Sequence, residues 1–150
     1  ALLNTPVDLS SFAAEPLHKD CLFLWAPSSH SLAGRDSVML EELAGQQVVV
    51  LTPDEYITTK GYVDRLRDEL GCEVHFADEM IGVLELAMEL DVFAISPRTH
   101  AMAFANEGHS AIPIRDVVWG FSLCWRSDKE LSEHEREFVA FMQKYRKFYC

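Results

Sequence analysis

The clearest hydrophobic pattern runs from Val117 to Trp125, where bulky and smaller residues alternate one by one. A period of two with one bulky face is typical of a β-strand. After a polar turn, Ser132 stands three residues before Glu135, which is the spacing of a helix capping box. Apolar residues then follow at helical spacing: Phe138, Met142, Tyr145 and Tyr149, with Val139, Phe141 and Phe148 widening the stripe. The sequence therefore predicts a strand and a closing amphipathic helix with the basic residues Lys144, Arg146 and Lys147 near its end.

The remaining chain alternates between the two periodicities. Short apolar runs predict strands at 1–3, 21–26, 47–51 and 92–95, the first two of them buried, and an alternating pattern predicts one at 73–77. A short edge strand is predicted at 111–114, where Pro113 suits an edge, and residues 8–14 are predicted to form a loop. Helical spacing predicts a turn at 39–44 and helices that end near Gly71, Leu90 and Glu107. The helix before Leu90 is apolar nearly all round, which predicts burial between layers, and Asp78 is its expected cap. Residues 102–104 are expected to face inward. Strands that alternate with helices predict an α/β fold with a largely parallel sheet.

Composition limits the possible functions. A chain of 150 residues is long enough for one domain with a core, and its net charge of −11 argues against direct binding to nucleic acid. Neither a membrane-spanning apolar run nor a signal-peptide pattern is present. The four cysteines lack a C-x-x-C spacing, so reduced thiols in the cytoplasm are expected rather than a zinc site.

The sequence nominates no residue for catalysis. It contains no G-x-S-x-G elbow, P-loop, G-x-G-x-x-G or H-E-x-x-H motif. Cys72 follows a predicted helix end, where the helix dipole is negative and raises the thiol pKa. We therefore expect neither an enzyme nor a bound metal or cofactor.

One group of polar residues suggests a binding site. Hydroxyl groups gather at a predicted loop-to-helix junction: Thr52, Tyr56, Thr58 and Thr59. A helix N-terminus has free N–H groups that suit a carboxylate or another anion, and ligands of open α/β sheets lie beyond the carboxyl ends of strands. Capping of the helix by Thr58 or Thr59 alone is the other interpretation.

An ordered set of segments resembles the effector-binding domain of LysR-type transcriptional regulators. The segments are H-S-L-A-G-R at 30–35, S-P-R at 96–98 and C-W-R-S-D-K-E-L-S at 124–132, and the resemblance extends from about Ala1 to Tyr145. Ser31 stands where the family usually has proline, and Leu90 and Val92 replace the usual glycines of a turn. The winged helix-turn-helix and the first strands of the effector domain have no counterpart here.

The resemblance implies a Rossmann-like fold of the type II periplasmic-binding-protein kind. Residues 28–117 would form an intact second subdomain, and residues 1–27 and 118–150 would be parts of the first. The effector would lie between the subdomains and contact Asn4, Thr5, Thr52, Pro53, Tyr56, Thr58, Thr59, Glu79 and Met80. Asn4 and Thr5 are equally well explained by a turn, and Glu79 by the helix dipole. Arg98 either pairs with an anionic effector or is solvated.

The implied function is that of a cytoplasmic ligand-sensing domain. It would bind a small, anionic effector and act on DNA only through a winged helix-turn-helix domain outside this chain. Unpaired strand edges lead us to expect a homodimer or a higher oligomer. A periplasmic-type solute-binding lobe, a small α/β enzyme with an unidentified catalytic residue and a pure dimerisation module are the alternatives.

Overall fold

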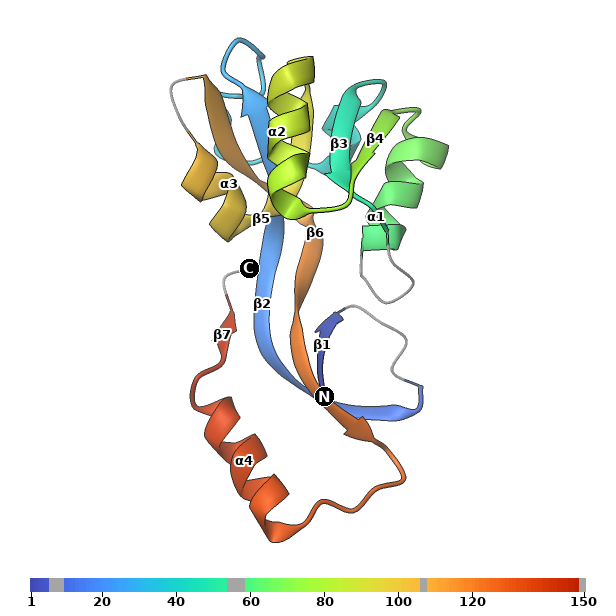
Figure 1. Ribbon diagram of the computed structural model, residues 1–150, viewed down its shortest axis with the longest axis vertical. Coiled ribbons are helices and arrows are strands. Elements are labelled where there is room, and N and C mark those ends of the chain that lie inside the picture. Colours follow the sequence, from blue (N-terminus) through green and yellow to red (C-terminus); the bar gives the residue numbers. More distant parts are fainter. Residues whose placement is uncertain (6–9, 54–58, 106–107, 149–150) are drawn as a thin grey trace. The chain divides into compact units, whose positions relative to one another are not determined.

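The computed structural model describes residues 1–5, 10–53, 59–105 and 108–148. Helices alternate with strands, which confirms the α/β class (Figure 1). The elements are β1 (Leu2–Thr5), β2 (Phe12–Pro27), the 3₁₀ turn η1 (Leu40–Leu43), β3 (Gln47–Leu51), α1 (Thr59–Asp64), the π-helical turn η2 (Arg65–Glu69), β4 (Glu73–Ala77), α2 (Met80–Leu90), β5 (Phe93–Pro97), α3 (Arg98–Phe104), β6 (His109–Arg126), α4 (Glu133–Gln143) and β7 (Lys147–Phe148). The strand order is β1-β6-β2-β5-β3-β4, and β7 pairs with β2.

No helix in the described ranges has both the length and the apolar character needed to cross a membrane.

The chain divides into two compact units. Unit 1 comprises Ala1–Asp20 and Val118–Cys150, and unit 2 comprises Cys21–Glu55 and Thr59–Val117. The chain therefore passes from one unit to the other within β2 and again within β6.

Unit 2 contains a sheet that is covered on both faces. Strand β3 is parallel to both β4 and β5, and β2 is antiparallel to β5. Val48, Val49 and Val50 of β3 are all fully buried, although successive side chains point to opposite faces of a strand. One face packs against α2 and α3 in a cluster of Cys21, Phe23, Trp25, Val49, Val83, Leu84, Ala87, Ala94 and Ala101.

The outer sides of α2 and α3 are more exposed than the sequence predicted. Helix α2 buries Val83, Leu84 and Ala87, whereas Ile81 and Met88 are about half exposed, so its predicted burial on all sides is wrong. The predicted inward orientation of residues 102–104 is also wrong, since α3 contacts the core through the buried Ala101. Both helices lie on one face of the sheet, and no described element covers their outer sides.

Turns at three helix ends follow the backbone preferences of their residues. Gly45 after η1 and Gly71 after η2 have φ angles of 71° and 63°, as expected for glycines that end helices. Asp91 caps α2 in the same left-handed region, with a φ of 54°, and is the one non-glycine residue with positive φ in the described ranges. The sequence had suggested unusual geometry here, because the usual glycines are absent. Aspartate accommodates the left-handed region better than most residues do.

Two strands are longer than expected. Strand β2 begins at Phe12, inside the predicted loop at 8–14, and the strand expected at 111–114 is the first part of the continuous β6. Pro113 does not interrupt β6, and its carbonyl accepts a hydrogen bond from Val38 N at 3.0 Å. Strand β1 is 4 residues long, but Leu2 is 58% exposed, so the predicted burial of this strand is wrong at that position.

Helix α4 of unit 1 has the predicted capping box. The Glu135 N–H donates to Ser132 Oγ at 3.4 Å, and the Ser132 N–H donates to Glu135 Oε2 at 2.9 Å. Hydrogen bonds from the Lys129 ammonium group and from Ser132 lower the pKa of the Glu135 carboxyl to about 2. The carboxylate that closes the cap therefore stays ionised at any ordinary pH.

The end and the environment of α4 differ from the prediction. The helix ends at Gln143, and Lys147–Phe148 instead pair with β2 as the short parallel strand β7. No residue of α4 is buried. Phe138 and Phe141 are each 52% exposed, and Tyr145 beyond the helix is 64% exposed. The apolar stripe predicted from the sequence exists, but no described element covers it.

A buried stack of two aromatic rings lies in unit 2. The rings of Trp25 and His109 are parallel to within 4°, with centroids 3.8 Å apart. Trp25 Nε1 and His109 Nε2 are both buried and have no hydrogen-bond partner among the described residues. Burial lowers the pKa of His109, and the Asp91 carboxylate acts in the opposite direction more weakly.

Because this stack buries His109, we expect the free energy of unfolding to decrease on acidification. The pKa of His109 is lower in the folded protein than in the unfolded chain, so the unfolded state takes up the proton first. The neutral ring therefore stabilises the fold above about pH 6.5, and this contribution is lost as the pH falls toward the folded-state pKa. Urea unfolding of the wild type and His109→Phe between pH 7.5 and pH 5 checks this. The phenylalanine variant keeps the stacked ring but cannot take up a proton, so we expect it to lose less stability than the wild type between pH 7.5 and pH 5. Equal losses in the two proteins would contradict the role of His109.

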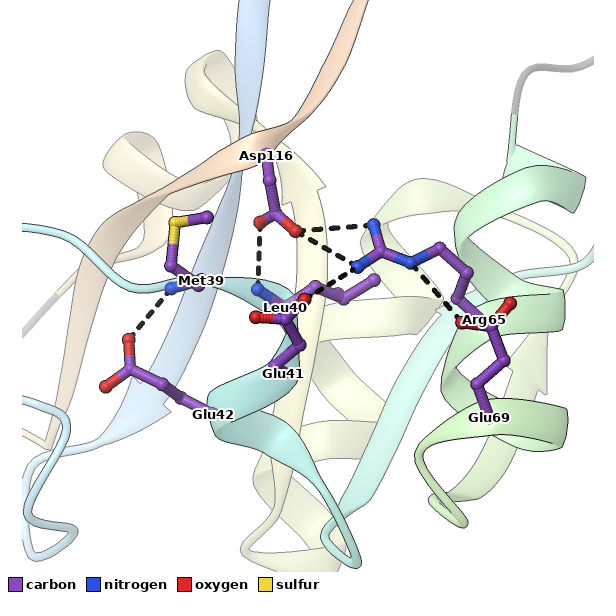
Figure 2. Close-up of polar contacts among 7 residues, drawn as sticks. All are labelled: Met39, Leu40, Glu41, Glu42, Arg65, Glu69 and Asp116. Carbon is purple, nitrogen blue, oxygen red and sulfur yellow. Dashed lines mark hydrogen bonds and ion pairs between the residues drawn. The ribbon is translucent and has the colours of Figure 1, made fainter.

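A polar cluster of Leu40, Glu41, Arg65, Glu69 and Asp116 joins three elements of unit 2 (Figure 2). Asp116 Oδ1 accepts a hydrogen bond from the backbone N–H of Leu40 at 2.8 Å. Its Oδ2 accepts from both terminal nitrogens of Arg65, at 3.3 and 3.2 Å. Arg65 also pairs with Glu41 at 3.5 Å and with Glu69 at 4.0 Å. The Asp116 cluster thus ties β6 to η1 and η2, next to the residue at which β6 leaves unit 2.

Candidate functional site at the carboxyl ends of the unit 2 strands

The carboxyl ends of three parallel strands meet at one edge of unit 2. Leu51 at the end of β3 pairs with Ala77 at the end of β4, and β5 runs in the same direction beside β3. Thr52, Asp78 and Arg98 directly follow these strands. We call this region the carboxyl edge. It is where ligands bind in many open α/β sheets.

Thr52 is held at the carboxyl edge by three interactions. Its backbone N–H donates to Ala77 O at 2.8 Å. Its Oγ1 lies 3.2 Å from the same carbonyl oxygen and 2.9 Å from Asp78 Oδ1, which both accept from it. Because the hydroxyl has one proton, it serves one acceptor at a time, and its lone pairs remain able to accept. The side chain is exposed and therefore accessible to a ligand.

The start of α2 has no side-chain cap. Asp78 was expected to cap this helix, but its carboxylate instead accepts from Thr52, and the N-cap residue is Glu79. The Glu79 side chain makes no capping hydrogen bond. The first N–H groups of an α-helix have no partner within the helix, so they remain donors for water or a ligand here. The prediction of Asp78 as the cap is therefore wrong.

The structure brings together several of the expected effector contacts. Thr52, Pro53, Glu79 and Met80 all lie at the carboxyl edge of unit 2, and Thr59 is the first residue of α1. Tyr56 and Thr58 lie outside the described residues. Asn4 and Thr5 are in unit 1, where their backbones pair with Phe121 and Gly120 of β6.

Arg98 supplies positive charge at the carboxyl edge. It is the first residue of α3 and is half-buried, with its guanidinium carbon 4.9 Å from the centre of the Phe23 ring. A guanidinium group can stack its face on an aromatic ring and bind an anion through its in-plane N–H groups. Asp78 and Glu79 contribute negative charge at the same edge, so anion binding here depends on N–H donors and on Arg98.

The nucleophilic residues are in unreactive surroundings. Cys21, Cys72 and Cys124 are buried free thiols. Burial raises the pKa of Cys72 and Cys124, which favours the poorly nucleophilic thiol form. Within the described ranges, no three His, Cys, Asp or Glu residues are grouped in a way that could hold a metal ion.

Known proteins match this chain in sequence pattern and in fold. A model of the LysR substrate binding domain family matches residues 1–147. The chain resembles the CcmR regulatory domain of Synechocystis PCC6803 in complex with 2-PG, with 15% identity and a TM-score of 0.69 over 97% of this chain and 72% of that one. It also resembles the effector-binding domain of QuiR in complex with shikimate, with 18% identity and a TM-score of 0.69 over 96% of this chain and 70% of that one.

A third similar structure comes from a longer protein. HinK, a LysR family transcriptional regulator from Pseudomonas aeruginosa, is 21% identical with a TM-score of 0.66, and the match covers 95% of this chain and 51% of HinK. The chain thus spans about half the length of HinK. No curated protein sequence matches the chain.

Proposed function

Because the chain belongs to the LysR substrate-binding domain family, we propose that it is an effector-sensing regulatory domain that binds a small organic anion at the carboxyl edge. The observation that carries this proposal is the pairing of two features at that edge. Thr52 is fixed by Ala77 and Asp78, and the adjacent start of α2 lacks a side-chain cap. Together they offer a hydroxyl and free backbone N–H donors to one ligand.

Two further considerations support an anionic effector. The guanidinium of Arg98 lies at the same edge and can pair with a carboxylate or phosphate. The similar CcmR and QuiR domains were solved with 2-PG and with shikimate, respectively. We propose Thr52, Pro53, Thr59, Glu79 and Met80 as contacts from unit 2. Tyr56 and Thr58 of the same junction, and Asn4 and Thr5 of unit 1, complete the proposed set.

In the proposed mechanism the domain transmits binding as a change of conformation. Residues 28–117 would act as the second subdomain, and residues 1–27 and 118–150 as part of the first. An effector shifts the balance between two arrangements only by binding one of them more tightly. DNA contact would come from a separate winged helix-turn-helix domain, since this chain has a net charge of −11. The domain would work in the cytoplasm, without catalysis and without a cofactor.

The Thr52 hydroxyl provides the first test of this proposal. We expect Thr52→Val, which removes the hydroxyl at nearly constant volume, to weaken binding of the best ligand by about tenfold, the effect of losing one good hydrogen bond. Thr52→Ser is the matched control and should retain most of the affinity. Binding is measured by ¹H–¹⁵N NMR titration with a panel of small carboxylates and phosphates that includes shikimate. Equal affinity in both variants, or shifts that avoid the amides of Thr52 and Met80, would argue against this site.

We also propose that the chain forms a homodimer or a higher oligomer. The apolar stripe of Phe138, Phe141 and Tyr145 is at least half exposed, which is costly for a monomer. Sedimentation velocity should therefore detect self-association at micromolar concentration. The double variant Phe138→Ser, Phe141→Ser should shift the protein toward monomer. A wild type that stays monomeric over the whole concentration range would refute this proposal.

A further inference from the structure

A small cavity lies at the end of the unit 2 sheet opposite the carboxyl edge. It has a volume of about 130 Å³ and is lined by Pro27, His30, Gln46, Gln47, Asp91 and Phe93, among others. Gln47 and Phe93 are the first residues of β3 and β5, and Pro27 is the last residue of the antiparallel β2. The cavity is therefore at the amino-terminal ends of the strands whose carboxyl ends form the candidate effector site. It is large enough for several water molecules or a small organic group.

Asp91 is the one formally charged residue in the lining of this cavity. Its carboxylate makes no ion pair with a lysine or arginine among the described residues, although it interacts with the His109 ring, and the residue itself is exposed. Asp91 also caps the C-terminus of α2, where the helix dipole already has its negative end. An acidic residue in the left-handed region at this position combines an unfavourable charge with a backbone angle that suits glycine better. A bound cation would relieve the electrostatic part of this cost.

The other polar groups in the lining can bind the rest of a ligand. His30 Nδ1 accepts the backbone N–H of Leu32 at 3.2 Å, so the proton of the neutral ring is on Nε2, which can donate. The His30 ring is fixed edge-to-face against Phe93, with centroids 4.6 Å apart and an interplanar angle of 79°. Gln46 is half-buried, and its amide can donate or accept. Pro27 and Phe93 are buried and give the cavity an apolar floor.

We propose that this cavity is a second ligand site, which binds the ammonium group of a small amine or amino acid through the Asp91 carboxylate. Opposite charge selects the ammonium group, and the lining contains no lysine or arginine that would repel it. The His30 N–H and the Gln46 amide would bind a carboxylate tail, as in an amino acid. The site is separate from the carboxyl edge, so two chemically different ligands could act on one unit.

The test is an NMR titration of the whole chain with methylammonium chloride and with glycine. Methanol is the neutral control of similar size to methylammonium, and sodium chloride controls for ionic strength. We expect saturable shifts of the His30, Gln46 and Phe93 amides with a Kd of about 1–10 mM, because a ligand of a few atoms makes few contacts. Glycine should bind more tightly than methylammonium if the tail contacts form; equal affinity would limit the site to the ammonium group.

Two matched variants test whether the Asp91 carboxylate binds the ammonium group. Asp91→Asn removes the charge but keeps a side chain that tolerates the left-handed region, so the fold should be retained. It should weaken ammonium binding at least about tenfold. Glu89→Gln removes a nearby exposed charge of α2 that does not line the cavity, and it should leave binding unchanged. Similar shifts with methanol, equal affinity of Asp91→Asn and wild type, or no saturable shifts at all would overturn the proposal.

Discussion

Replacing Gly120 with alanine is expected to destabilise the protein by about 3 kcal/mol or more, near the upper end for single substitutions. A Cβ atom on Gly120 would lie 2.0 Å from the carbonyl oxygen of His18 and 3.3 Å from the Cα of Lys19. Both atoms belong to the backbone of β2, so they cannot move away by a change of rotamer. Either the two strands separate locally, which breaks hydrogen bonds, or the contact stays severely compressed.

Urea unfolding provides the measurement, with Gly61→Ala as the control. Gly61 lies in α1, and a Cβ atom there would meet nothing within 4 Å. Alanine favours a helix over glycine, so this variant should gain up to about 1 kcal/mol. The same chemical change should therefore act in opposite directions at the two positions. Unchanged stability of Gly120→Ala would mean that β2 and β6 do not approach as closely as described.

The second large effect is expected for Asp116→Ala, with a loss of about 2–3 kcal/mol. The substitution leaves the N–H of the fully buried Leu40 without its acceptor. It also removes the carboxylate oxygen that accepts from both terminal nitrogens of Arg65. The side chains of Arg65 and Asp116 are 32% and 20% exposed, so solvent screens part of that attraction. Most of the loss should therefore come from the N–H group.

Asp116→Asn separates the two contributions. The asparagine side-chain oxygen can still accept from Leu40 but has no charge for Arg65, so we expect a loss of about 1 kcal/mol or less. A double-mutant cycle of Asp116→Ala with Arg65→Ala, measured by urea unfolding, should give a coupling energy of similar size. If the alanine and asparagine variants were equally unstable, the ion pair rather than the buried N–H would dominate.

The sequence predicted the elements whose signals are local. The capping box of Ser132 and Glu135, the valine-rich β3 and the glycine at the end of η2 each depend on neighbouring residues, and all three are present. The carboxyl edge was predictable for a related reason, because the order of strands and helices fixes which ends meet. The Asp116 cluster was not, since Leu40 and Asp116 are 76 residues apart and no local pattern joins them.

Errors arose where burial depends on what covers an element. Periodicity identifies the apolar side of a helix, but it does not reveal whether another element packs against that side. Helix α4 has the predicted stripe without a cover, and α2 exposes Ile81 and Met88. The lengths of β2 and β6 were underestimated because residues 8–14 were expected to form a loop and Pro113 suggested a short edge strand, whereas β2 begins at Phe12 and Pro113 lies within the continuous β6.

The double crossing of β2 and β6 between the units also sets the order in which the chain can fold during synthesis. Both stretches of unit 2, Cys21–Glu55 and Thr59–Val117, come before Val118, so the partners within unit 2 are all available once Val117 has left the ribosome. Strand β1 pairs with β6 through Leu2 and Leu123, and this contact has to wait for the later segment. Closing so long a loop is slow compared with the local pairings of unit 2. During this interval β1 is without its pairing to β6, and a strand edge that waits for its partner is open to a wrong one.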